Sequence, residues 1–207
     1  METVMKKESK FITLKGLVLS VLLSLLMLVI TLLVSAALMA VPAVVGILGS
    51  GLPAFLCGIP YVLMTAKNRG IGTYFIFSLV FGIYFLASGS FPTAIFFIIA
   101  GVIGELTMIG GWQKKWRPLV PYLVHWLMYT YASTLQFLFF KDMILQTYMG
   151  MGMDEAAALV AMDSHAAMLT DPFTMIVGTV CCVGLAVLGY FVGTRALRKY
   201  FKAAGVA

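Results

Sequence analysis

Few residues in the apolar parts of this chain could do chemistry, and Glu105, His125 and Gln136 are the main ones. An ionisable side chain inside a membrane segment is costly to bury, so each is a functional candidate. Glu105 could serve a gate or a partner contact, or it could pair with a cation of 114–117. His125 could carry a proton, or it could be a hydrogen-bonded packing residue. For both residues we favour the structural role.

The polar segment 141–171 is the only long one between apolar runs. It holds five of the chain's eight acidic residues but only one of its fourteen Lys and Arg. Asp154 is typical of a helix N-cap, and Glu155 in the first turn would favour the helix dipole, so we expect a helix over 155–169. Methionines crowd the same segment. Such side chains suit an apolar or flat ligand, although they also fill gaps.

The composition indicates an integral membrane protein. The chain is 62% hydrophobic and 11% charged, with a mean hydropathy of +1.04. A soluble domain is roughly half apolar and a quarter charged. The net charge of +6 matches the excess of Lys and Arg on the inner side of membrane proteins, so we predict no nucleic-acid partner.

Six apolar runs predict an all-α protein with six transmembrane helices in one membrane domain over 1–207. Each run is near the ~20 residues that cross a bilayer. The runs are 16–41, 46–66, 71–87, 92–109, 119–140 and 172–192. Glycines and prolines interrupt the second run, and such breaks need protein or a cavity to satisfy the freed backbone groups. The segment 141–171 becomes a lid between the fifth and sixth runs.

The basic residues predict the direction of the helices. If six helices alternate, the side with both termini receives every Lys and Arg except Lys141. Because Lys and Arg concentrate in cytoplasmic loops, both termini are predicted to be cytoplasmic in the cell membrane, with the lid extracellular.

Small residues recur at a spacing that lets helix backbones approach closely. The pairs are Ala36 with Ala40 and Gly189 with Gly193. They could pack helices within the chain, or they could form a smooth face on which another membrane protein docks. The sequence leaves both interpretations open.

We predict that a small molecule binds beneath the outward loops 42–53 and 141–171, between the outer halves of the fourth to sixth runs. Aromatic and Met side chains would bury its apolar parts, and a few polar groups would orient it. The candidate substrate-binding residues are Tyr131, Gln136, Lys141, Asp142, Tyr148, Met151 and His165. A lone exposed histidine is seldom a ligand, so no metal site and no cofactor is predicted.

The chain lacks the motifs of a self-powered transporter or a hydrolase. It contains no GxxxxGK[ST], HExxH or GxSxG pattern, so it does not bind ATP through a P-loop. An ion-coupled carrier or channel would need charges near the bilayer midplane, which are almost absent. A membrane enzyme would depend on Glu105 or His125 without partners at metal spacing. We therefore predict that the chain is not an enzyme; a regulatory subunit without a ligand is a further alternative.

Five short motifs follow one another along the chain in a characteristic order. They are GIPYVLMTAK at 58–67, GEL at 104–106, KD at 141–142, MGMDE at 151–155 and RKYFKAAG at 198–205. In their order and spacing the chain resembles the MptD (Trep_Strep) family of S components of energy-coupling-factor (ECF) transporters. The resemblance covers nearly the whole length.

The resemblance implies a six-helix S component without an ATPase of its own. It would work with a membrane-embedded T subunit and two cytoplasmic ATPases. Such a component binds a micronutrient at its outer face and topples in the membrane to release it inside. The T subunit docks on small residues of the first helix, which Ala36 and Ala40 match. The substrate is left open between a vitamin-like compound and haem or another tetrapyrrole.

Overall fold

The computed structural model describes residues 11–38, 42–109, 116–150 and 152–201. Most of these residues are helical, and within them the only strand-like pairing is one parallel bridge between Phe11 and Ile71. In chain order the helices are α1 (Leu14–Leu38), α2 (Pro42–Leu48), α3 (Gly51–Leu56), α4 (Gly58–Lys67), α5 (Thr73–Ala87), α6 (Phe91–Met108), α7 (Leu119–Phe139), α8 (Lys141–Gly150), α9 (Glu155–Thr170), α10 (Pro172–Ala196) and the π-helical η1 (Leu197–Phe201).

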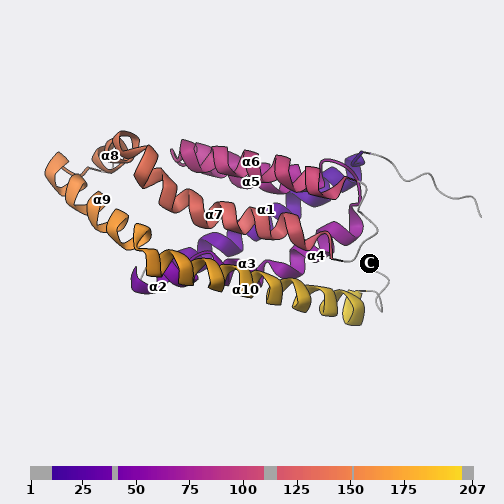
Figure 1. Ribbon diagram of the computed structural model, residues 1–207. Coiled ribbons are helices and arrows are strands. Elements are labelled where there is room, and N and C mark those ends of the chain that lie inside the picture. The colour runs from indigo at the N-terminus through magenta and orange to yellow at the C-terminus, as the bar shows by residue number, and fades with distance from the viewer. Residues whose placement is uncertain (1–10, 39–41, 110–115, 151, 202–207) are drawn as a thin grey trace, which may run out of the picture.

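The helices form an elongated bundle with two different ends (Figure 1). Helices α1, α5, α6, α7 and α10 run lengthwise, and α2, α3 and α4 together follow the same direction. Helices α8 and α9 lie at one end, which we call the lid end. The start of α1 and the end of α10 lie at the other end, which we call the basic end.

Segments far apart in the sequence are joined at the basic end. The Asn68 side-chain amide donates hydrogen bonds of 2.8 Å to the carbonyl of Gly16 and to Oγ of Ser20. The Tyr61 hydroxyl donates to the carbonyl of Pro118. These bonds fix the start of α1, the end of α4 and the start of α7 to one another.

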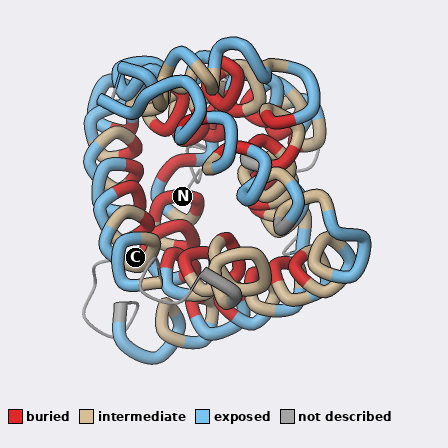
Figure 2. Tube along the Cα trace, turned by 90° about the vertical axis from the view of Figure 1, so that its left-hand side faces the viewer, coloured by how far each residue is buried: buried red, intermediate tan, exposed pale blue. Residues whose placement is uncertain are grey.

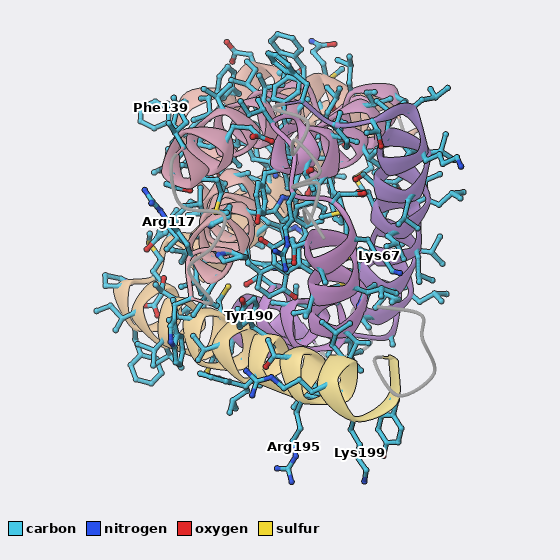
Figure 3. The ribbon with its side chains drawn as sticks, turned by 90° about the vertical axis from the view of Figure 1, so that its right-hand side faces the viewer. Lys67, Arg117, Phe139, Tyr190, Arg195 and Lys199 are labelled. Carbon is cyan, nitrogen blue, oxygen red and sulfur yellow. The ribbon has the colours of Figure 1, made fainter. Side chains whose placement is uncertain are left out.

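The charged residues are separated along the bundle. Except for Lys141, the described Lys and Arg belong to segments at the basic end, and Figure 3 shows Arg195 and Lys199 pointing away from the helices there. Except for Glu105, the described acidic residues belong to α8, α9 or their ends. The structure thus has the separation of charge that the sequence predicted, while the direction of the bundle in a membrane stays a prediction.

Length and hydropathy identify three helices among the described residues that could span a membrane, or four if one bent pair counts as a single span. They are α1, α6 and α10 continued through η1, with Val44–Leu56 and Gly58–Lys67 as the bent pair. Helix α5 is apolar but shorter, at 15 residues. Helix α7, with 21 residues, is not among the candidate spans, and it carries His125, Gln136 and several hydroxyl groups. Six spans therefore stay a prediction.

Buried residues face the centre of the bundle, and exposed residues face outward along the helices (Figure 2). Aromatic side chains of α4, α5 and α7 fill the centre, where the ring centroids of Tyr61 and Tyr122 lie 4.2 Å apart. On α1, the small polar residues Ser20, Ser24 and Thr31 are buried, whereas its leucines are largely exposed. An apolar outside with hydroxyl groups inside suits a bundle surrounded by lipid.

The second predicted run is three short helices instead of one. The helical segments Val44–Leu56 and Gly58–Lys67 follow each other with a bend of 43° between them. The segment 42–53, predicted as an outward loop, is instead mostly helical in α2 and the start of α3. That prediction was wrong because Pro42, with its fixed φ, suits the first turn of a helix as well as the end of one.

Helix α10 packs directly on the backbone of this broken segment. A Cβ atom added to Gly189 would overlap the backbone of Phe55, and one added to Gly193 would overlap that of Gly58. By contrast, a Cβ atom on Gly184 of the same helix would meet nothing within 4 Å. The breaks in the second run therefore lie against protein.

Replacing Gly189 with Ala is expected to destabilise the fold, whereas Gly184→Ala should not. The added methyl of Gly189→Ala must push α10 away from α3, and overpacking of this kind costs ~1–3 kcal/mol. The apparent melting temperature of the purified protein in detergent measures the difference. Equal melting temperatures for the two variants would contradict the packing described here.

Candidate functional site

A cavity of about 190 Å³ lies toward the lid end, between α1, α2, α7, α10 and the last turn of α9. Of its described lining residues, eight carry a hydroxyl group and none is Asp, Glu, Lys, Arg or His. The hydroxyl-bearing residues are Ser35, Ser50, Tyr129, Thr130, Tyr131, Thr134, Thr174 and Thr179. The cavity thus has hydroxyl groups but no charged group in its described lining, and most of its surface is apolar.

Glycines bring two walls of the cavity together. A Cβ atom on Gly178 would lie 2.6 Å from the carbonyl oxygen of Gly46, so α2 and α10 touch through their backbones. Both glycines line the cavity. A side chain at either position would separate these walls, and this close approach explains why glycine is needed there.

Hydrogen bonds between hydroxyl groups connect the walls. Tyr131 of α7 lies 3.0 Å from Oγ1 of Thr179 on α10. Thr130 of α7 donates to Oγ of Ser50, the residue before α3, at 2.7 Å. The polar lining therefore also holds α7 in place against α10 and α3.

Asp171 joins α9 to α10. It is the only residue between α9 and α10, and its Oδ2 accepts hydrogen bonds from the backbone N–H and the hydroxyl of Thr174 at 2.8 and 3.0 Å. These bonds, that from the backbone first, lower the pKa of Asp171 below its usual 3.8. Because Thr174 lines the cavity, this N-cap also fixes a cavity residue.

The predicted lid contains two helices. Helix α9, Glu155–Thr170, agrees with the helix expected over 155–169 and has the expected N-cap: Oδ1 of Asp154 accepts from the N–H of Ala157 at 2.7 Å. Helix α8 was not predicted. Leu169 of α9 lines the cavity, so the end of α9 forms part of the candidate site.

Of the predicted substrate-binding residues, Tyr131 lines the cavity. Gln136 lies elsewhere, where its Oε1 accepts from the hydroxyls of Ser90 and Thr93 before and within α6. Lys141 and Asp142 are exposed in the first turn of α8 and do not line the cavity.

Tyr148 and His165 meet outside the cavity. The Tyr148 hydroxyl lies 3.4 Å from Nδ1 of His165, and the His165 ring lies nearly parallel to the rings of Tyr148 and Phe137. This contact joins α8 and α9 to the end of α7. Met151 lies outside the described residues, within which no group of three His, Cys, Asp or Glu could hold a metal ion.

The predicted docking residues have different surroundings. Ala36 is exposed on α1, and Ala40 lies outside the described residues. Gly189 and Gly193 pack on α3 and α4 within the chain. The close approach that these two glycines permit is therefore intramolecular, and a docking role for any of the four residues stays a prediction.

Glu105 caps a neighbouring helix. Its Oε1 accepts hydrogen bonds from the backbone N–H groups of Tyr74 and Phe75 at 2.7 and 3.1 Å. These are first-turn donors of α5, whose N-cap residue is Gly72 at φ +107° and has no side chain to serve them. The ion pair expected with 114–117 is not formed by Arg117, whose Nε donates to the carbonyl of Thr107; 114 and 115 lie outside the described residues.

His125 is a buried packing residue with 1% of its surface exposed. Its Nδ1 lies 3.0 Å from the Ser78 hydroxyl, and its ring stacks on Phe77 at a centroid distance of 3.9 Å. Its Nε2 has no partner among the described residues. The hydrogen-bonded packing role predicted for His125 agrees with this arrangement.

Most lining residues were missed by reasoning from sequence. Serine and threonine inside apolar runs are common in membrane helices, where they bond to backbone carbonyls, so no single one stands out. Thr130 and Thr134 lie one helical turn apart on the same face of α7, and this spacing was the usable signal. Ser50 and Thr179 become neighbours of α7 only through the fold.

The apolar outer surface and the candidate membrane spans define an integral membrane protein, and its cavity carries hydroxyl groups but no charge among the described lining residues. The family model Trep_Strep, described as a hypothetical bacterial integral membrane protein, matches residues 14–203. The chain therefore belongs to the Trep_Strep family of bacterial integral membrane proteins. No curated protein and no solved structure matches the chain.

Two substitutions of Glu105 test whether its oxygen caps α5. Glu105→Gln keeps an oxygen that accepts the α5 hydrogen bonds, so the stability should be retained. Glu105→Leu leaves two first-turn N–H groups without their partner and should cost ~1–3 kcal/mol. The apparent melting temperature of the purified protein in detergent measures both effects. A Glu105→Gln protein that melts as low as Glu105→Leu would contradict the capping role.

The Asp171 cap should be sensitive to acid. A carboxyl group whose pKa is lower in the folded than in the unfolded state stabilises the folded protein at pH values above the unfolded-state pKa. This stabilisation is lost as the pH falls through the folded-state pKa. Asp171→Ala should therefore melt below the unchanged protein at pH 7, and the difference should shrink as the pH falls below 3.8. The exposed residue Asp163 in the middle of α9 provides the control variant Asp163→Ala. A difference for Asp171→Ala that is independent of pH would argue against the cap.

Proposed function

We propose that this protein is the substrate-binding S component of an ECF-type importer. The observation that supports this most strongly is an uncharged, hydroxyl-lined cavity toward one end of an apolar bundle, with the basic residues at the other end. A cavity with convergent polar groups is the usual form of a small-molecule site. Membership of an integral membrane family and the resemblance of the sequence motifs to S components agree with this role.

In this proposal the bundle crosses the membrane six times. Helices α5 and α7 lie lengthwise beside the candidate spans (Figure 1). Hydroxyl groups of α7 face other helices of the same bundle and the cavity. The basic end, where α1 starts and α10 ends, is cytoplasmic in this proposal, because Lys and Arg are retained on that side, and both termini are proposed to be cytoplasmic. The lid end then faces the exterior, where a substrate is captured.

The lid and α2 form the entrance in this proposal. Leu169 at the end of α9 and Val45 of α2 both line the cavity, so a displacement of α9 would open it. The Tyr148–His165 contact ties α9 to α8 and would keep the lid closed over a bound molecule. Release inside the cell would follow toppling of the whole bundle against a T subunit, driven by two partner ATPases.

The alternatives have less support. An enzyme would need Glu105 or His125 in a reaction, yet Glu105 is occupied by the start of α5 and His125 is enclosed by aromatic rings. An ion-coupled carrier would need ionisable groups around the cavity, and none of the described lining residues is Asp, Glu, Lys, Arg or His.

The proposal is tested by reconstitution. The chain in liposomes with a T subunit and two ATPases should take up the molecule that copurifies with it, as identified by mass spectrometry after denaturation. Uptake should require ATP and should stop when the ATPases are omitted. Ala36→Trp should weaken association with the T subunit, whereas Val180→Trp on the exposed face of α10 should not. Equal uptake by the chain alone would exclude the S-component role.

A further inference from the structure

Four of the eight hydroxyl groups that line the cavity direct their hydrogens to other groups of the protein. A hydroxyl has one hydrogen and two lone pairs. Thr130 lies 2.9 Å from the carbonyl of Trp126, Thr179 donates to that of Met175 at 2.7 Å, and Thr174 donates to the carboxylate of Asp171.

Tyr131 is used in the same way. Because the hydrogen of Thr179 goes to a carbonyl, the 3.0 Å contact between Tyr131 and Thr179 has Tyr131 as its donor. Four lining hydroxyls therefore offer oxygen lone pairs to the cavity and no hydrogen. A bound molecule must supply the hydrogen donors for its contacts with these four groups.

The charge of the bound molecule is limited by the same lining. A buried charge is costly unless an opposite charge or several matched hydrogen bonds compensate it. An anion would find neither a Lys, Arg or His among the described lining residues nor hydrogens on these four hydroxyls. A cation would need a carboxylate, and the nearest one along the hydrogen-bond chain, Asp171, already serves the N-terminus of α10.

We infer that the cavity selects an uncharged small molecule that carries several hydrogen-bond donors, such as a polyol, a neutral sugar or a neutral heterocyclic amide. This inference rests on the proposed function, since it concerns the substrate of the same cavity. Leu38, Val45, Leu169 and Met175 provide an apolar wall that would cover the non-polar face of such a molecule.

The size of the cavity points the same way. At about 190 Å³, it is smaller than the roughly 300–1,000 Å³ of most ligand pockets. Haem is much larger and carries two carboxylates, so the tetrapyrrole that the sequence left open matches neither the volume nor the lining.

The experiment measures binding to the full chain in lipid nanodiscs by calorimetry. The neutral probes are myo-inositol, D-ribose and uracil; the charged probes are nicotinate, ethanolamine and hemin. At least one neutral probe should bind, and no charged probe should bind in competition with it. Failure of all three neutral probes at millimolar concentration, or competitive binding of a charged probe, would overturn the inference.

Variants of one helix place the binding in the cavity. Thr179→Val removes an acceptor from the lining and should weaken the neutral probe about three- to tenfold, the range for one hydrogen bond. Thr179→Ser restores the hydroxyl and should restore affinity, which separates binding from folding. Thr194→Val is the matched control, because Thr194 also bonds to a carbonyl of α10 but lies near the basic end. Equal effects of Thr179→Val and Thr194→Val would contradict the assigned site.

The inference and the proposed function fail in different ways. A charged molecule that binds in the cavity and is imported only with the T subunit and ATPases would refute the inference and leave the importer role intact. A neutral molecule that binds through Thr179 but crosses the membrane without those partners would refute the importer role and leave the inference intact.

Discussion

The structure depends on the backbone-to-backbone contact between α10 and the broken second segment. Gly178 admits α2, while Gly189 and Gly193 admit α3 and α4. Three short helices could not hold their positions in lipid alone, because the breaks between them leave backbone groups in need of partners. Packing on one long glycine-bearing helix supplies a fixed surface for all three. The cavity lies where α2 and the start of α10 complete its wall, so it exists only while this contact is made.

Polar groups inside the bundle are used as connectors. Asn68 joins α1 to the end of α4, Glu105 joins α6 to the start of α5, and Ser78 meets His125 between α5 and α7. Lipid provides no hydrogen-bonding partners, so each of these groups is stable only inside the protein. The hydroxyl groups of the cavity lining also bond to other groups of the protein. They differ in that, in our inference, some of their oxygen lone pairs accept hydrogen bonds from a bound small molecule.

Local signals in the sequence predicted local features well. Asp154 and Glu155 specified the start of α9 through capping, and the apolar runs located α1, α5, α6, α7 and α10 to within a few residues. Features that depend on contacts between distant segments were not predicted. Thr179 is one hydroxyl among many until α10 places it beside Tyr131, and Glu105 looks like half of an ion pair until α6 brings it to the N-terminus of α5.

A single residue, Asp171, separates α9 from α10, and this short connection limits how the two helices can move. Helix α10 is 25 residues long and behaves as a rod of about 38 Å at 1.5 Å per residue. Because the connection is one residue long, α9 cannot move independently of the first turn of α10. A rotation of α9 must therefore take place about Asp171. Occupancy of the cavity and the tilt of α10 are then coupled through Asp171. A change in the tilt of α10 on binding would be transmitted along this one helix to the opposite end of the bundle.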